Sequence, residues 1–185
     1  IDDKRDDYDI AFLEGSFTRP SDREEVQEIR KMAKLCVAIG ACACIGGVNA
    51  MKNSHSMEFC RNTVYGDKSY LIETFPTQRV GDVINVDYEI HGCPITTKEL
   101  LDVTKKLLMG VPLKQNTFPV CTECKANSNV CILRHKEEIC MGSITRGGCE
   151  AICPSFGDAC RGCRGFLEHA NFPGYAKILR DNGYS

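Results

Sequence analysis

The stretch Leu35-Cys-Val-Ala-Ile-Gly-Ala-Cys-Ala-Cys-Ile-Gly-Gly47 begins as a continuous apolar run and ends in a turn rich in glycine and cysteine. A short apolar run closed by glycine predicts a buried strand, here Leu35–Ile39. In open parallel sheets, functional sites form at the carboxyl ends of the strands. Cys42 therefore stands at a candidate site, where glycine lets the backbone approach a bulky inorganic group closely.

The segments on either side of this run alternate between strand and helix patterns. Asp9–Leu13 is a short apolar run that predicts another buried strand, and residues 84–90 alternate like a half-covered strand. Capping-box patterns that begin at Ser21 and at Thr96 predict the starts of two helices. Strands that alternate with helices predict an α/β fold with a mainly parallel sheet.

A second cysteine follows the third predicted strand, in residues 91–94 (His-Gly-Cys-Pro). Either Cys42 or Cys93 alone could be a small buried apolar residue, as free cysteines often are. Two cysteines at corresponding strand ends favour metal ligands instead. Cys36 lies inside a predicted strand and is expected in the core, whereas Cys44 could be a ligand or a neighbour of one. None of the four histidines is expected to bind metal.

Eight of the 13 cysteines lie within residues 121–163 and form two sets of four. The sets are Cys121-x2-Cys124-x6-Cys131-x8-Cys140 and Cys149-x3-Cys153-x6-Cys160-x2-Cys163. Four soft sulfur ligands select zinc or an iron–sulfur cluster. Zinc ribbons usually carry two CxxC pairs, but each set here has only one, so the irregular spacing favours iron–sulfur clusters over zinc. Disulfides are the third alternative, and an odd number of cysteines cannot pair completely.

Composition limits the other possibilities. The chain has 185 residues and a net charge of −2, without the basic excess of a nucleic-acid-binding protein. It also has no apolar run long enough to span a bilayer. The composition changes near residues 112–119, so we expect one domain over 1–112 and a cysteine-rich domain over 113–185. The second domain has few apolar residues, and metal binding is expected to supply much of its folding energy.

Taken together, these motifs resemble a known family. The pattern Gly40-x-Cys42-x3-Gly46-Gly47, then Gly92-Cys93-Pro94, and then the eight-cysteine tail is similar to the small, electron-transferring subunit of [NiFe] hydrogenases. The stretch from Cys140 to Gly165 resembles the cytoplasmic members, including those of sulfhydrogenases and methanogen hydrogenases. The resemblance covers residues 9 to about 165.

The resemblance implies a flavodoxin-like domain that holds a proximal [4Fe–4S] cluster at the large-subunit interface. It also implies a small, irregular, ferredoxin-like domain with a medial and a distal [4Fe–4S] cluster. The implied ligands are Cys42 and Cys93 for the proximal cluster, Cys149, Cys153, Cys160 and Cys163 for the medial one, and Cys121, Cys124, Cys131 and Cys140 for the distal one. The family takes its other two proximal ligands from a CxxC motif after an N-terminal strand, which we expect to precede the given sequence.

The function that the resemblance implies is electron relay in a soluble, cytoplasmic [NiFe] hydrogenase. The partners would be a large subunit with the nickel–iron site and a redox subunit carrying flavin, iron–sulfur clusters or both. No catalytic residue is then expected in this chain, and the terminal electron acceptor belongs to the partner chains. The alternatives are a zinc-stabilised interaction module and the related 20 kDa cluster subunit of respiratory complex I, which should lack the eight-cysteine tail.

Three arginines lie beside the implied ligands: Arg146, Arg161 and Arg164. Their positive charge could favour reduced, more negative clusters and so raise the reduction potentials. The alternative is that each is a solvated surface residue.

Overall fold

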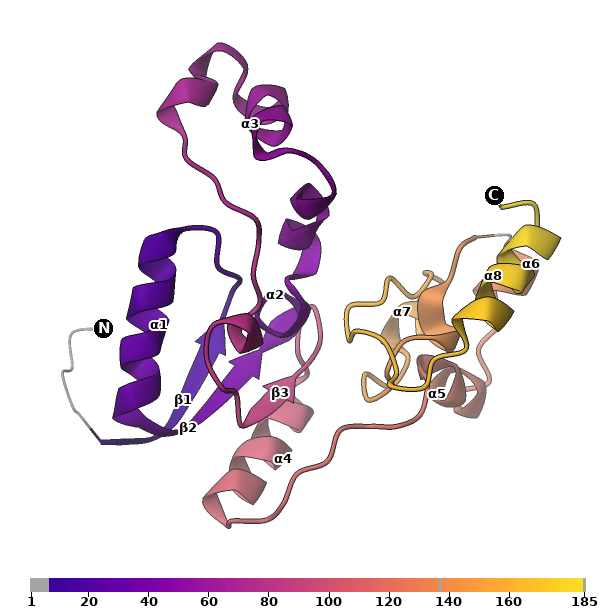
Figure 1. Cartoon of the computed structure of the whole chain (residues 1–185). Coiled ribbons are helices and arrows are strands. Elements are labelled where there is room, and N and C mark those ends of the chain that lie inside the picture. The colour runs from indigo at the N-terminus through magenta and orange to yellow at the C-terminus, as the bar shows by residue number, and fades with distance from the viewer. Residues whose placement is uncertain (1–6, 137, 185) are drawn as a thin grey trace. The chain divides into compact units, whose positions relative to one another are not determined.

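A computed structural model describes residues 7–136 and 138–184 of the chain (Figure 1). The chain divides into two compact units, residues 1–95 and 96–185. The domain boundary predicted from composition lies further along, at 112, and stays a prediction.

The first unit contains a sheet of three parallel strands in the order β1-β2-β3. They are β1 (Tyr8–Glu14), β2 (Ala33–Ile39) and β3 (Tyr88–Ile90). This confirms the prediction of an α/β fold with a parallel sheet. The central strand β2 buries Cys36, Val37 and Ala38 completely. Strand β1 is less buried than the sequence predicts. It pairs with β2 on one side, and Leu13 is its one buried residue.

The third strand is shorter than the alternation of residues 84–90 predicts. Ile84 is still held by a turn, with its N–H bonded to the carbonyl of Val80 at 3.1 Å. The chain reaches β2 at Asp87, whose N–H bonds to the carbonyl of Cys36 and whose carboxylate accepts the N–H of Cys36 at 2.8 Å. The strand pairing therefore begins only after Asp87, and Ile84 packs on the core from a loop.

Helix α1 (Pro20–Met32) connects β1 to β2 and places Val26 in the core (Figure 1). The predicted capping box at Ser21 is wrong. Pro20 occupies the first turn, where its missing N–H costs nothing, and the Ser21 hydroxyl contacts Asp22 instead. The other predicted cap is confirmed, because the Thr96 side chain accepts the N–H of Glu99 at the start of α4.

Directly after β2, the glycine-rich segment forms a short helix, α2 (Gly40–Ile45), rather than the predicted turn. Gly46 ends this helix with a φ of +79°, a conformation that glycine adopts without strain. The remaining elements of the first unit are η1 (Gly47–Ser54), α3 (Met57–Tyr65), η2 (Gly66–Leu71) and η3 (Val80–Asp82).

The second unit has short helices and no strand within its described residues, 96–136 and 138–184. Its elements are α4 (Thr97–Leu108), α5 (Val120–Ala126), α6 (Ile132–His135), η4 (Met141–Ser143), α7 (Ile152–Ser155) and α8 (Phe172–Asp181). Among the described residues, no helix combines the length and the apolar character needed to cross a membrane.

Candidate metal centres

The carboxyl ends of the three strands lie in register. Glu14 pairs with Ile39, and Ile39 pairs with Ile90, so the segments that follow the strands start side by side. The N–H of Ala41 in α2 bonds to the carbonyl of Gly92 at 2.8 Å. This bond links the segment that carries Cys42 to the segment that carries Cys93. The structure thus joins the two strand ends that the sequence singles out.

Both cysteines at this edge have access to solvent: Cys42 is partly buried and Cys93 is exposed. Gly47 makes room for the sulfur of Cys42, because a Cβ at Gly47 would lie 2.8 Å from it. The φ of Gly47 is +56°, so a side chain there would also strain the backbone. The absence of a side chain at residue 47 therefore keeps the Cys42 thiol open.

Next to this edge, the structure reveals a group that the sequence analysis did not predict. Cys44, Glu89 and His91 place one potential ligand atom each within 4.8 Å of one another. His91 is only 2% exposed, and its Nε2 lies 3.1 Å from Oε2 of Glu89. Glu89 in β3 and His91 directly after it are two residues apart, and residues at that spacing lie on the same side of an extended chain. This spacing is the sequence signal for the pair.

In the second unit, the structure gathers the first set of four cysteines. Helix α5 carries Cys121 and Cys124 three residues apart, on one face. Burial raises the pKa of Cys121 to about 11, and the other three thiols of the set, those of Cys140, Cys124 and Cys131, contribute to the rise. A Cβ at Gly142 would lie 3.4 Å from the sulfur of Cys121 and 3.8 Å from that of Cys140, so these two sulfurs of the set border the same space beside Gly142.

The second set of four cysteines is joined less closely. Burial raises the pKa of Cys160 to about 11, and Cys163 is one of the neighbours that add to this rise. Cys149 lies beside Glu123 and Arg164, and Cys153 is exposed on α7. Neither Cys149 nor Cys153 is among the groups that shift the pKa of Cys160.

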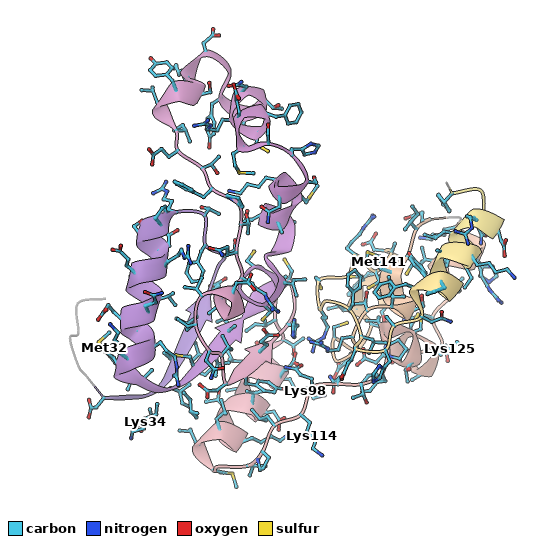
Figure 2. The ribbon with its side chains drawn as sticks, in the orientation of Figure 1. Met32, Lys34, Lys98, Lys114, Lys125 and Met141 are labelled. Carbon is cyan, nitrogen blue, oxygen red and sulfur yellow. The ribbon has the colours of Figure 1, made fainter. Side chains whose placement is uncertain are left out.

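The two sets touch at Cys140 and Cys160. The backbone N–H of Cys160 donates to the sulfur of Cys140 at 3.3 Å. In return, the N–H of Met141 donates to the carbonyl of Cys160 at 2.9 Å, and Figure 2 marks Met141 within this segment. These two bonds connect a member of one set directly to a member of the other.

Arg164 is a buried residue, so the surface alternative is wrong for it. Its side chain is 1% exposed and pairs with both carboxylate oxygens of Glu99, at 2.8 and 2.7 Å. Its Nε donates to the carbonyl of Gly147 at 2.9 Å. Burial raises the pKa of Cys149, and the charge of Arg164 opposes this rise. Arg161, in contrast, is exposed and Arg146 is half-buried.

Tyr175 of α8 also lies beside the cysteines and was not predicted. Its hydroxyl oxygen is buried and has no hydrogen-bond partner in the structure. Burial raises the pKa of Tyr175, and the charges of Cys140 and Cys160 contribute to the shift. A buried hydroxyl without a partner indicates a site where an acceptor binds.

The described cysteines are free thiols, and the small buried cluster of this segment depends on them. The cluster consists of Val120, Ala151 and Cys160, and three more cysteines pack against it: Cys124, Cys140 and Cys149. Four of the eight candidate ligands of this segment therefore belong to this cluster or pack against it.

Comparisons with known proteins match both the first part of the chain and nearly its whole length. The family described as NADH ubiquinone oxidoreductase, 20 Kd subunit, matches residues 2–107. Sulfhydrogenase 2 subunit delta of Pyrococcus furiosus is 33% identical over 177 residues, which cover 96% of this chain and 74% of the relative. The F420-non-reducing hydrogenase of Methanocaldococcus jannaschii has a subunit that is also 33% identical, over 85% of this chain and 64% of the relative.

Two solved structures share the fold. A NAD+-reducing [NiFe]-hydrogenase in the H2-reduced state contains a chain that is 27% identical, with a TM-score of 0.53 over 60% of this chain and 71% of that one. An actinobacterial-type NiFe-hydrogenase from Ralstonia eutropha H16 contains a chain with a TM-score of 0.57, over 90% of this chain and 63% of that one. The second chain is 15% identical, so its likeness concerns the fold alone.

Proposed function

Because this chain belongs to the small-subunit family of [NiFe] hydrogenases, we propose that it relays electrons through three [4Fe–4S] clusters. The relay runs between a nickel–iron site on a separate large subunit and a further redox subunit that carries flavin, iron–sulfur clusters or both. In this proposal the first domain is flavodoxin-like and the complex works in the cytoplasm.

The observation that carries the proposal is the placement of the first set of cysteines: Cys121 and Cys124 share helix α5, and the sulfurs of Cys121 and Cys140 both border the space beside Gly142. The hydroxyl of Tyr175 is buried without a hydrogen-bond partner among the described residues, which is a second point in favour, because cluster sulfur accepts hydrogen bonds. The residues present therefore fit an iron–sulfur cluster in the cysteine-rich segment.

The spacing of the sulfurs favours clusters over zinc. Thiolates on one zinc ion lie roughly 3.8 Å apart, since each Zn–S bond is about 2.3 Å long. Among the described residues, no three of the candidate cysteine sulfurs lie within 4.8 Å of one another. An iron–sulfur cubane spreads its four ligands over a larger body than a single ion.

The residues then have distinct roles. Cys121, Cys124, Cys131 and Cys140 hold the distal cluster, and Cys149, Cys153, Cys160 and Cys163 hold the medial one. Cys42 and Cys93 supply two ligands of the proximal cluster. When bound, the clusters accept and release single electrons. The protein thiols lose their protons as the clusters assemble, and buried Arg164 places a fixed positive charge beside Cys149.

The alternative of a complex I 20 kDa subunit is disfavoured by the extent of the matches. The match to that family ends at residue 107, before the first of the eight cysteines, whereas the match to the sulfhydrogenase subunit covers 96% of the chain. The terminal electron acceptor is set by the partner chains.

Metal analysis tests the proposal. The full-length subunit, purified without oxygen, should contain about twelve irons, from three cubanes of four, and little zinc. It should be brown and show the electron paramagnetic resonance (EPR) signals of reduced [4Fe–4S] clusters. Stoichiometric zinc with negligible iron would refute the relay and support a zinc-stabilised interaction module.

A further inference from the structure

Three different kinds of metal-binding side chain meet at the end of β3 in the first unit. Within the described residues, Cys44, Glu89 and His91 bring one sulfur, one carboxylate oxygen and one ring nitrogen within 4.8 Å of one another. Cys44 is fully buried and His91 is 2% exposed, whereas the side chain of Glu89 is 26% exposed. None of the three belongs to the proposed cluster ligands, so this group does not depend on the relay.

Regular secondary structure fixes the position of these side chains. The thiol of Cys44, in α2, lies 3.5 Å from the carbonyl oxygen of Ala38 in β2 and 3.5 Å from that of Ile90 in β3. Ile90 stands between Glu89 and His91 in the chain, so the contact to its carbonyl brings the sulfur to both of them. Ligands on such rigid elements need little rearrangement to bind an ion.

The distances suit a single zinc ion. Nε2 of His91 lies 3.1 Å from Oε2 of Glu89. A nitrogen and an oxygen on one tetrahedral zinc lie roughly 3.3 Å apart, because both bonds are about 2.0 to 2.2 Å long. A sulfur lies roughly 3.6 Å from either, since the Zn–S bond is about 2.3 Å long. The donor set also suits zinc, whereas magnesium and calcium take oxygen ligands.

Charge also favours a divalent cation at this place. Zinc binds a thiolate and a neutral imidazole, so protons pass from Cys44 to the solvent as the ion enters. The thiolate and the carboxylate of Glu89 then balance the two charges of the ion. Arg79 is a nearby cation, since a Cβ at Gly81 would lie 3.8 Å from Oε1 of Glu89 and 4.0 Å from Cζ of Arg79. Its Nε pairs with Asp82 at 2.9 Å.

We propose that Cys44, Glu89 and His91 bind one zinc ion, which joins α2 to the end of β3. Three protein ligands leave a fourth position for water. The partly exposed carboxylate of Glu89 marks the side from which the ion enters. The ion fixes, relative to each other, the two segments that carry Cys42 and Cys93.

The test adds zinc to the full-length, iron-loaded subunit, purified without oxygen and dialysed to remove loosely held ions. In this form, iron occupies the cysteine sets, so added zinc reports on the remaining ligands. Isothermal titration calorimetry compares the wild type with His91→Gln and with Glu89→Gln. His55→Gln is the matched control, because His55 is an exposed histidine of the same unit.

The wild type and His55→Gln should each bind about one zinc ion per subunit, as one set of ligands allows. His91→Gln should lose this binding. Glu89→Gln should weaken it by more than about tenfold, since even residues that only support a metal ligand contribute about 10- to 100-fold. Glu89→Gln keeps the shape of a partly exposed side chain and so guards against a loss that reflects misfolding. Zinc should raise the thermal unfolding midpoint of the wild type but not that of His91→Gln.

A second measurement needs no variant. X-ray absorption at the zinc edge of the zinc-loaded wild type should show one sulfur ligand per zinc, with nitrogen and oxygen as the others. Zinc bound by four sulfurs, or equal zinc binding by the wild type and His91→Gln, would overturn the proposal. An iron-replete wild type that binds no zinc would also overturn it and leave Glu89 and His91 as an ion pair only. A preparation without iron, in contrast, refutes the relay.

Discussion

Cys36 and Cys93 are the same residue type in opposite environments. The side chain of Cys36 is fully buried in β2, where its sulfur accepts an N–H from Arg30 at 3.3 Å. Cys93 is exposed at the carboxyl edge of the sheet. Cys36→Ala should cost about 1 kcal/mol of folding free energy, the usual range for removing one buried heavy atom, and leave all cluster signals intact. Cys93→Ala should instead abolish the proximal signal.

Denaturation and EPR spectroscopy of the two variants check this prediction. Equal loss of cluster signals in both variants would mean that exposure does not separate core cysteines from metal ligands in this chain.

The ion pair of Arg164 and Glu99 illustrates the energetics of a buried charge. Glu99→Ala leaves Arg164 charged, 1% exposed and without its carboxylate partner. Removing one partner of such a pair should cost about 3 kcal/mol of stability. The double variant Glu99→Leu/Arg164→Met should recover much of this loss, because no unpaired charge then remains.

Lys98 and Glu150 provide the matched control, since they form an ion pair whose side chains are 85% and 70% exposed. Lys98→Ala should change stability little, because solvent screens such a pair. Denaturation of the iron-loaded subunit, followed by circular dichroism, measures all of these variants. A loss in Glu99→Ala no larger than that in Lys98→Ala would contradict the account.

At the scale of secondary-structure elements, sequence patterns predicted those features that depend on a few consecutive residues. The apolar run of β2 and the cap of α4 at Thr96 are of this kind. Helix α2 was not predicted, because glycine both precedes and follows its cysteines and a turn has the same composition. The position of Tyr175 depends on where α8 packs, and no local pattern encodes that contact.

The dependence of the cysteine-rich segment on metal is testable at this scale. Candidate ligands make up one of the three residues of its buried cluster and the three cysteines packed against it, so removing iron should cost the segment most of its folding energy. In the iron-free subunit, amide hydrogens of α5 and η4 should exchange fast with solvent, whereas those of β2 should remain protected. Hydrogen exchange before and after chelation measures the difference. Continued protection of α5 in the iron-free form would show that apolar packing alone supports this segment.

At the scale of the whole molecule, the carboxyl edge of the sheet decides where a partner must bind. Electrons from a large subunit would enter at the proximal cluster, so the segments 14–16, 40–47 and 92–94 should be covered together. Apolar side chains continue this surface, because Val48 and Met51 in η1 are each 73% exposed. An obligate interface of this kind usually buries more than about 2,000 Å² in total.

Two charge reversals test whether this edge is the interface. Glu14 ends β1 at the carboxyl edge and is exposed. Glu28 is also exposed, but it lies in the last turns of α1, which leads back to the opposite edge where β2 begins. Glu14→Arg should weaken co-purification with the large subunit at least tenfold. One unpaired charge buried in an interface costs about 2 to 5 kcal/mol, which exceeds the roughly 1.4 kcal/mol of a tenfold change. Glu28→Arg should leave co-purification unchanged. Equal binding by both variants, with the amide hydrogens of the three segments still exchanging freely in the complex, would refute the proposed point of electron entry while leaving the cluster assignments in place.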